Sequence, residues 1–367
     1  MTTIISVRGL LPPHCYSQAE FADITLAHFP DPIPYGSKTV SHAAARRMFN
    51  NSGVRQRHAV QPLADSYAMT SAARVSRLQR EKAAEHGAAA LSDALAEAGL
   101  RPDEVDLLAT TSYMAIGAPP WDLDVVRLAG LRSDVHRLPL HGIGCAAGAA
   151  MISRMHDYLT ANPGHVAVGV ASEAPTLVFG QREPVFSRLV ETTMFGDGSA
   201  AVVMTGAERP PPAAARPRVV SSLSLLLPDS ADLTGWNLAE DGLETFLGPG
   251  LPPLVESSAP QAVERLLSPR GLTTDDIGVW VCHPGSARVM DSLVKGLSLT
   301  DDAIALSRSL MQRTGNMVSA SVLHVLADTL KTMPPAGSWG LMTAFGPGIV
   351  AELVLLRWDA PHEGLAV

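Results

Sequence analysis

Apolar positions along this chain follow two patterns, short continuous runs and longer stretches with helical spacing. Continuous runs bounded by turn residues are typical of buried strands. We expect such strands at 107–111, 166–170, 201–204, 279–282 and 353–356. Helical spacing predicts helices over 83–98 and 259–267, which precede the strands at 107 and 279. Strands that alternate with helices in this way predict a layered α/β fold.

Three pairs of similar stretches occur in the same order in the two halves of the chain. The pairs are 98–111 with 270–283, 144–151 with 315–322, and 195–198 with 345–348. Their shared order indicates a duplicated half-domain. If the two copies pack face to face, equivalent positions meet, and Cys145, His283 and Asn316 would share one site.

The duplication also suggests how the chain is divided. We expect an N-terminal half over 1–209, a Pro- and Ala-rich linker over 210–217, and a C-terminal half over 218–367. The first 40 residues have no counterpart in the second half. We therefore expect them to be an addition to the duplicated unit.

Composition narrows the class of protein. The chain has 367 residues, 46% of them apolar, and can bury a large core. We find no run of about 18 uncharged apolar residues, so no transmembrane span is expected, and the first ten residues do not resemble a signal peptide. Three cysteines in so long a chain are no disulfide framework, which suits the cytoplasm. The net charge of −8 argues against nucleic acid as a partner.

Residues 41–58 form a basic segment in this acidic chain. The segment holds Arg46, Arg47, Arg55 and Arg57 and no acidic residue. Two interpretations stay open. It is either a solvated face or a docking site for a phosphorylated small molecule, because guanidinium groups bind phosphate oxygens in pairs.

Cys145 is the candidate nucleophile. It follows Gly142-Ile143-Gly144 and begins a run of small residues, which predicts a tight turn that leads into a buried helix. Backbone N–H groups and the helix dipole at such a position favour a thiolate, so we expect the thiol to ionise easily. The alternative is a packed core cysteine.

His283 and Asn316 each have an ordinary structural interpretation as well. His283 could be a histidine at a strand end with its hydrogen bonds satisfied, and Asn316 could be a helix N-cap. Together with Cys145, however, they form a set with a chemistry. The histidine can hold the sulfur as a thiolate, ready to take an acyl group from a thioester. Both nitrogen donors can then stabilise the enolate that a malonyl thioester forms on losing carbon dioxide. This chemistry needs no metal or redox cofactor, and neither a dinucleotide-binding glycine motif nor a phosphate-binding P-loop motif is present.

The order and spacing of these motifs resemble the type III polyketide synthases, the chalcone-synthase-like branch of the thiolase superfamily. The resemblance covers residues 5–358 and rests on five stretches, Gly144–Gly148, Phe195–Ala201, His283–Gly285, Gly315–Met317 and Ala344–Gly348. It implies two βαβαβ halves in a five-layer αβαβα core. It also implies a homodimer that loads an acyl group from coenzyme A onto Cys145 and extends it with malonyl-CoA. His283 and Asn316 would then drive decarboxylation.

The resemblance assigns further roles. Phe195 would be a gatekeeper of the cavity, and Thr111 would belong to the cavity wall. Arg47 matches a basic position that contacts coenzyme A, whereas the two other basic positions fall on Ala44 and Asn51. Gly285 and Arg288 are the other candidates for contact with coenzyme A.

Departures from the family pattern concern the cavity. Trp236 stands where plant chalcone synthases have glycine, Val318 replaces a serine, and Val178 replaces a threonine. The second gatekeeper phenylalanine aligns with Thr245, although a shift by one residue would place Phe246 there. Bulkier walls predict a smaller cavity and hence a small phenolic or pyrone product. Tetrahydroxynaphthalene synthases, which also carry an aromatic near the Trp236 position, are the nearest comparison.

Two other functions stay open from the sequence. One is a single-step condensing enzyme or acyltransferase like the ketoacyl synthases, which would take malonyl groups from a carrier protein. The other is a catalytically silent partner subunit. The starter unit, the number of extensions and the mode of ring closure depend on the shape of the cavity.

Overall fold

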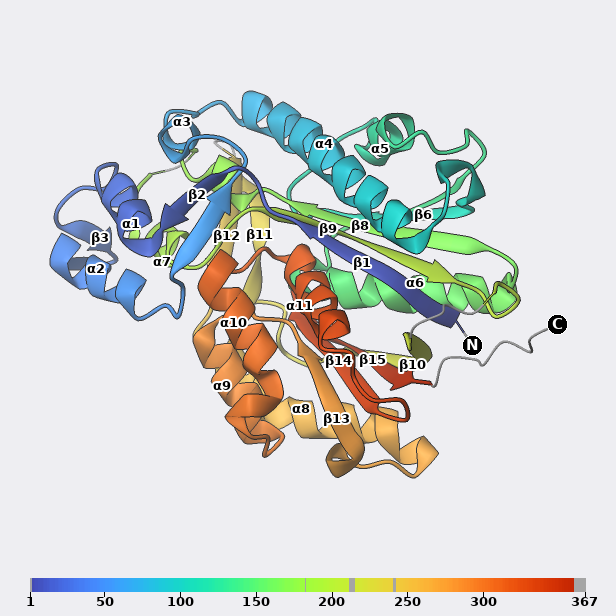
Figure 1. The fold of residues 1–367 in the computed structure, drawn as a ribbon. Coiled ribbons are helices and arrows are strands. Elements are labelled where there is room, and N and C mark those ends of the chain that lie inside the picture. Colours follow the sequence, from blue (N-terminus) through green and yellow to red (C-terminus); the bar gives the residue numbers. More distant parts are fainter. Residues whose placement is uncertain (1, 182, 211–214, 240–241, 360–367) are drawn as a thin grey trace.

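The computed structural model describes residues 2–181, 183–210, 215–239 and 242–359 (Figure 1). A nine-stranded mixed sheet forms its centre. In spatial order its strands are β13 (Ile277–Cys282), β14 (Trp339–Gly346), β15 (Val350–Trp358), β10 (Pro217–Leu226), β1 (Thr2–Leu10), β9 (Gly198–Thr205), β8 (Val166–Glu173), β6 (Leu107–Thr111) and β7 (His136–Leu140).

The helices of the described chain surround and separate the strands. They are α1 (Gln18–Leu26), α2 (His42–Asn50), α3 (Leu63–Tyr67), α4 (Ala72–Ala98), α5 (Asp122–Leu128), α6 (Ala147–Ala161), α7 (Phe186–Thr192), α8 (Leu251–Leu267), α9 (Ala287–Gly296), α10 (Ala305–Thr314) and α11 (Ser319–Lys331). Three two-stranded ribbons complete the fold, β2 (His14–Ser17) with β5 (Gln56–Ala59), β3 (Ile33–Tyr35) with β4 (Lys38–Val40), and β11 (Thr234–Ala239) with β12 (Gly242–Leu247).

The sheet consists of two half-sheets with the same internal order. β1, β9, β8 and β6 in the first half correspond to β10, β15, β14 and β13 in the second. Within each half the last two of these strands are parallel and the others antiparallel. The halves are joined where β1 pairs with β10 over only two residues, Thr2 and Thr3. This confirms the predicted duplication.

Five layers follow from the helix contacts. α4 packs on β1, β8 and β9, and α8 packs on β10 and β15, so each helix covers the outer face of its half. α6 and α11 touch each other and contact strands of both halves, and so form the central layer (Figure 1). The strands β6, β8 and β9 are buried along their whole length, as expected for strands covered on both faces. The predicted αβαβα architecture is therefore confirmed.

Small residues let the two central helices approach closely. A Cβ atom on Gly148 would lie 2.4 Å from the carbonyl oxygen of Ser319, at the start of α11. No side chain larger than hydrogen fits there without moving one of the helices. The run of small residues after Cys145 thus sets the spacing of the central layer.

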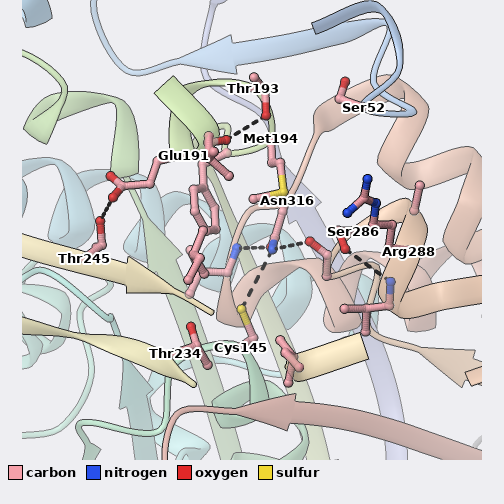
Figure 2. A pocket seen from close by; sticks show the side chains of 18 of the residues that line it. Ser52, Cys145, Glu191, Thr193, Met194, Thr234, Thr245, Ser286, Arg288 and Asn316 are labelled. Carbon is pink, nitrogen blue, oxygen red and sulfur yellow. Dashed lines mark hydrogen bonds between the residues drawn. The ribbon is translucent and has the colours of Figure 1, made fainter. Parts of the chain in front are cut away.

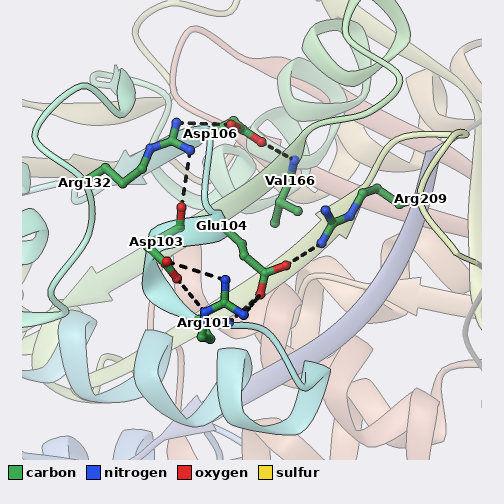
Figure 3. Close-up of polar contacts among 7 residues, drawn as sticks. All are labelled: Arg101, Asp103, Glu104, Asp106, Arg132, Val166 and Arg209. Carbon is green, nitrogen blue, oxygen red and sulfur yellow. Dashed lines mark hydrogen bonds and ion pairs between the residues drawn. The ribbon is translucent and has the colours of Figure 1, made fainter.

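The acidic residues of the first duplicated pair have the same local role in both halves. Glu104 accepts a hydrogen bond from the backbone N–H of Arg101 at 3.0 Å, and Asp276 accepts one from Thr273 at 2.7 Å. Each closes a 3-10 turn just before a strand. In the first half a polar network extends this turn, because Asp106 binds both Arg132 and the N–H of Val166 at the start of β8 (Figure 3).

All five predicted strands and both predicted helices are present, and both helices start earlier than expected. α4 begins at Ala72, where Ser71 accepts a hydrogen bond from the N–H of Arg74. α8 begins at Leu251 and continues through Pro260. Proline removes one helical N–H, so the carbonyl of Glu256 lacks its usual donor. That carbonyl lies against Gly296 of α9.

The expectation that the first 40 residues are an addition to the duplicated unit was wrong for β1. This strand is the counterpart of β10 and lies at the centre of the sheet. A strand without a recognisable motif cannot be matched by sequence similarity, whereas the pairing register identifies it. Of the predicted linker, 211–214 lies outside the described residues, and Pro217 already belongs to β10. The proposed division into 1–209 and 218–367 stays a prediction.

Candidate active site

A cavity of about 860 Å³ opens at the ends of the central helices. Cys145, His283 and Asn316 all line it, although they come from three distant parts of the chain. Figure 2 shows Asn316 directed toward Cys145, with Glu191 and Thr245 on one side and Ser286 and Arg288 on the other. The structure therefore brings the three candidate catalytic side chains to one chamber.

Cys145 lies in a 3-10 turn (Gly144–Ala146) that leads directly into α6, as predicted. Gly144 precedes it with φ +54°, and a Cβ atom there would lie 2.6 Å from Cδ of Pro347. The residue is partly exposed and lines the cavity. The expectation that it ionises easily is wrong for the isolated group, because burial raises the pKa of Cys145 to about 12, although the Asn316 amide lowers it in part.

Asn316 makes several hydrogen bonds besides its contact with the nucleophile. Its Nδ2 donates to the Gly285 carbonyl at 2.9 Å and lies 3.9 Å from Sγ of Cys145. Its Oδ1 accepts from the N–H of Val318 at 2.8 Å, and its own N–H donates to the Met194 carbonyl. The carboxamide is thereby fixed with one N–H on Gly285 and the other toward the sulfur.

The orientation of the Asn316 carboxamide is accompanied by an unusual backbone conformation at Val318. Its φ is +48°, a region that β-branched residues rarely adopt and that costs about 1–3 kcal/mol. The residue also lines the cavity. A strained backbone next to a fixed amide is typical of sites where orientation matters more than local stability.

His283 follows β13 and is almost fully buried. Neither ring nitrogen has a hydrogen-bond partner in the described structure, and the Thr343 hydroxyl nearby in the cavity lining also has none. Burial lowers the pKa of His283 to about 3, so the imidazole is neutral at pH 7. An unpaired buried polar group is costly, and such groups point to a ligand that completes them.

The cavity wall is formed by α7, β12 and the turn Pro175–Val178. Phe195 and Val178 line it as predicted. Thr245 lines it too, and its hydroxyl donates to Glu191 of α7. Glu191 also forms a buried ion pair with Arg188, at 3.0 Å.

The basic residues predicted to contact coenzyme A lie at the mouth of the cavity. Arg47 on α2 and Arg288 in the first turn of α9 both line the cavity and are exposed to solvent. Gly285 lines it between His283 and α9, and Ala44 and Asn51 lie on the same wall as Arg47. Of the other arginines in the basic segment, Arg46 pairs with Asp23 at the surface, whereas Arg57 is completely buried.

Three predicted pocket residues do not line the cavity. Thr111 is buried within the sheet at the end of β6. Trp236 lies opposite Thr245 in its ribbon and packs edge-on against Tyr113, and both of these neighbours line the cavity, although Trp236 itself does not. Phe246 lies opposite Gly235, and its side chain is on the face of the ribbon opposite to that of Thr245. The one-residue shift that would have restored a gatekeeper phenylalanine therefore does not occur. Strand alternation explains this result, because neighbouring residues face opposite sides.

Sequence reasoning missed Tyr113, Glu191 and Thr343, which line the cavity, and Glu173 behind it. Glu173 is buried and accepts hydrogen bonds from Ser319 and the N–H of Tyr113. Burial raises its pKa to about 7. A buried strand that ends in a carboxylate was the available signal for this residue.

The residues that the structure describes contain no group of three or more His, Cys, Asp or Glu side chains arranged to hold a metal ion. No helix among them is long and apolar enough to cross a membrane.

Comparison with known proteins gives matches over nearly the whole chain. Residues 11–219 match the family model of FAE1/type III polyketide synthase-like proteins, and residues 218–358 match the C-terminal domain of chalcone and stilbene synthases. A 1,3,6,8-tetrahydroxynaphthalene synthase of Streptomyces peucetius subsp. caesius is 35% identical over 97% of this chain and 93% of its own. The enzyme of that name from Streptomyces coelicolor is 30% identical over 86% of this chain and 83% of its own.

Solved structures give the same result. The crystal structure of 1,3,6,8-tetrahydroxynaphthalene synthase from Streptomyces coelicolor A3(2), a bacterial type III polyketide synthase, superposes with a TM-score of 0.89. It has 27% sequence identity and covers 98% of this chain and 99% of the other.

Proposed function

Because the chain belongs to the type III polyketide synthases, we propose that Cys145 carries the growing acyl chain and that His283 and Asn316 drive the decarboxylative condensation. The family consists of acyl-transferring condensing enzymes, and the comparisons do not favour the ketoacyl-synthase-like or the silent-subunit alternative. The observation that carries the residue assignment is the contact of Asn316 Nδ2 with Cys145 Sγ, in a cavity that also holds the unpaired imidazole.

The proposed cycle begins with loading. The imidazole of His283 takes the thiol proton, and Sγ of Cys145 attacks the thioester carbonyl of an acyl-CoA, so that coenzyme A leaves as its thiol. Malonyl-CoA then loses carbon dioxide, and negative charge develops on its thioester oxygen. The N–H groups of His283 and Asn316 stabilise this enolate.

The enolate carbon next attacks the acyl carbonyl on Cys145. A carbon–carbon bond forms, the C–S bond to Cys145 breaks, and the extended chain remains on coenzyme A. Repeated loading and extension give a polyketone that cyclises in the cavity. We propose that no metal or redox cofactor takes part, since the two nitrogen donors supply the stabilisation that each step requires.

Residues at the mouth and on the wall of the cavity support the proposed substrate class. Arg47 and Arg288 are the proposed phosphate contacts of coenzyme A, with Gly285 close to the thioester. The apolar lining of Val178, Phe195 and Val318 suits an uncharged acyl chain. The tetrahydroxynaphthalene synthases among the relatives support a small phenolic product.

A homodimer is part of the proposal. β7 is the outermost strand of its half-sheet, and the ion pair of Arg137 with Asp122 links it to α5. α5 exposes Leu123 and Leu128 beside that edge. A strand edge with apolar neighbours is suited to pairing with a second copy, and light scattering measures the state directly. We place the enzyme in the cytoplasm, where its three free cysteines would stay reduced.

The function is tested with malonyl-CoA alone and with a panel of acyl-CoA starters, with products identified by mass. We expect an acyl adduct on Cys145 and cyclised products without any carrier protein, and we expect Cys145→Ala to lose both. Condensation that requires a carrier protein, or a protein without an acyl adduct, would contradict the proposal.

A further inference from the structure

Arg57 is a fully buried arginine that the proposed reaction does not use. It lies on β5, and its exposed fraction is 0%. It therefore cannot meet a phosphate group in solution, which excludes the docking interpretation for this member of the basic segment. Burial of a charged guanidinium is costly, so its contacts need an explanation.

The contacts of Arg57 converge on one loop. Its Nη1 donates to the carbonyl oxygens of Thr192 at 2.6 Å and Phe195 at 2.9 Å. Thr192 is the last residue of α7, where carbonyl groups lack helical partners and a cation is favoured. The guanidinium carbon lies 3.3 Å from the ring centre of Phe21, which holds it from the other side.

The peptide group between Phe195 and Gly196 connects Arg57 to the catalytic residue. Its carbonyl oxygen accepts from Arg57, and its N–H donates to the carbonyl oxygen of Asn316 at 3.1 Å. The N–H of Asn316 in turn donates to the carbonyl oxygen of Met194, the residue before Phe195, at 2.9 Å. The loop that carries Phe195 and the residue that carries the carboxamide are thus joined by a short β-bridge.

Arg57 also packs directly beside the residue before Asn316. A Cβ atom on Gly315 would lie 3.0 Å from Cδ of Arg57, and one on Gly196 would lie 3.4 Å from its Cβ. Gly315 has φ +67°. The side chain therefore fills the space on both sides of the bridge, and the two glycines let it do so.

We propose that Arg57 is a positioning residue for decarboxylation, which holds the Phe195–Gly196 peptide and through it the backbone of Asn316. The carboxamide then keeps its place beside Cys145. This inference rests on the proposed function of Asn316. Loading of Cys145 by an acyl-CoA takes its base from His283 and uses Asn316 only through the amide beside the sulfur, so it depends less on this link.

The test compares two half-reactions in Arg57→Lys. Lysine has one nitrogen on a flexible chain and cannot reproduce the planar group that stacks on Phe21 and binds both carbonyls. We expect malonyl-CoA decarboxylation to fall by about tenfold or more in kcat, because small misplacements of catalytic groups are costly. KM for malonyl-CoA and the rate of Cys145 acylation should stay within about twofold. Arg55→Lys, at an exposed arginine two residues away, is the matched control.

A purely structural role predicts a different result. Both half-reactions would then fall by the same factor, in step with the folded fraction measured by circular dichroism. That outcome, or an unchanged decarboxylation rate in folded Arg57→Lys, would overturn the inference.

A second variant covers the case in which Arg57→Lys does not fold. Phe21→Leu keeps both carbonyl hydrogen bonds but removes the ring that holds the guanidinium. It should lower the ratio of decarboxylation to acylation in the same direction, and an unchanged ratio would refute the role of Arg57. The unmodified enzyme is measured first. If it showed neither malonyl-CoA decarboxylation nor acylation of Cys145, the proposed function itself would be refuted.

Discussion

The proposed proton transfer from Cys145 to His283 gives the sharpest prediction, which concerns how the thiol ionises. Burial raises the pKa of Cys145 to about 12 and lowers that of His283 to about 3. Each group alone is therefore neutral at pH 7. The proposed mechanism therefore requires thiolate and imidazolium to form together, since each charge would compensate the cost of burying the other.

Replacement of the imidazole removes this compensation. In His283→Gln the thiol keeps a pKa of about 12, so its thiolate fraction at pH 7 is on the order of 10⁻⁵. Alkylation of Cys145 by iodoacetamide should then rise about tenfold per pH unit between pH 7 and pH 9. In the unmodified enzyme the reaction should be about 10²–10⁴ times faster at pH 7, and it should depend less on pH.

Peptide mass spectrometry after timed alkylation measures this directly. It separates Cys145 from the exposed Cys15, whose rate serves as an internal control and should be the same in both proteins. His28→Gln, at an exposed histidine, is the matched control variant. Identical pH profiles for Cys145 in His283→Gln and the unmodified enzyme would refute the proposed proton transfer.

Three other predictions concern the core and the cavity. Burial raises the pKa of Glu173 to about 7, so the folded enzyme loses stability as the pH rises from about 4.5 through 7. Glu173→Gln should remove most of this loss, which amounts to a few kcal/mol. A Tm that falls equally in both proteins between pH 5 and pH 8 would disprove the prediction. Gly148→Ala should lower the urea midpoint strongly because its Cβ meets a carbonyl of α11, whereas Gly278→Ala, where the Cβ meets nothing within 4 Å, should leave it nearly unchanged. Trp236→Gly should free space beside the lining residue Tyr113 and lengthen the product, and products of unchanged mass would count against the volume argument.

The sequence allowed much of the fold to be predicted because the duplication left local marks. The acidic residues before β6 and β13 close equivalent turns, and small residues recur where α6 and α11 meet. β1 has no such mark, since a strand in the centre of a sheet needs only apolar side chains. Its role is visible only from its partners, β9 and β10.

The candidate site was predictable to a different extent. Cys145, His283 and Asn316 follow from motifs, and they lie in one cavity. Thr245 and Phe246 show what sequence alignment cannot determine, because a shift of one residue in the strand register decides which side chain faces the cavity. Arg57 looked like part of a basic surface, since a charge pattern alone does not reveal that the side chain is buried.

The ionisation of Cys145 shows most clearly how a local rule fails. A turn at the start of a helix favours a thiolate, and the structure does place Cys145 before α6. The same central layer that provides this helix also removes most of the solvent around the partly exposed cysteine, and burial has the larger effect on its pKa. The first copy of the duplicated unit carries the sulfur, and the second carries the imidazole and the carboxamide that line the same cavity. In the proposed mechanism these two groups stabilise the charge of the thiolate. A single half-domain would present the thiol without this imidazole, so the proposed reaction requires both halves.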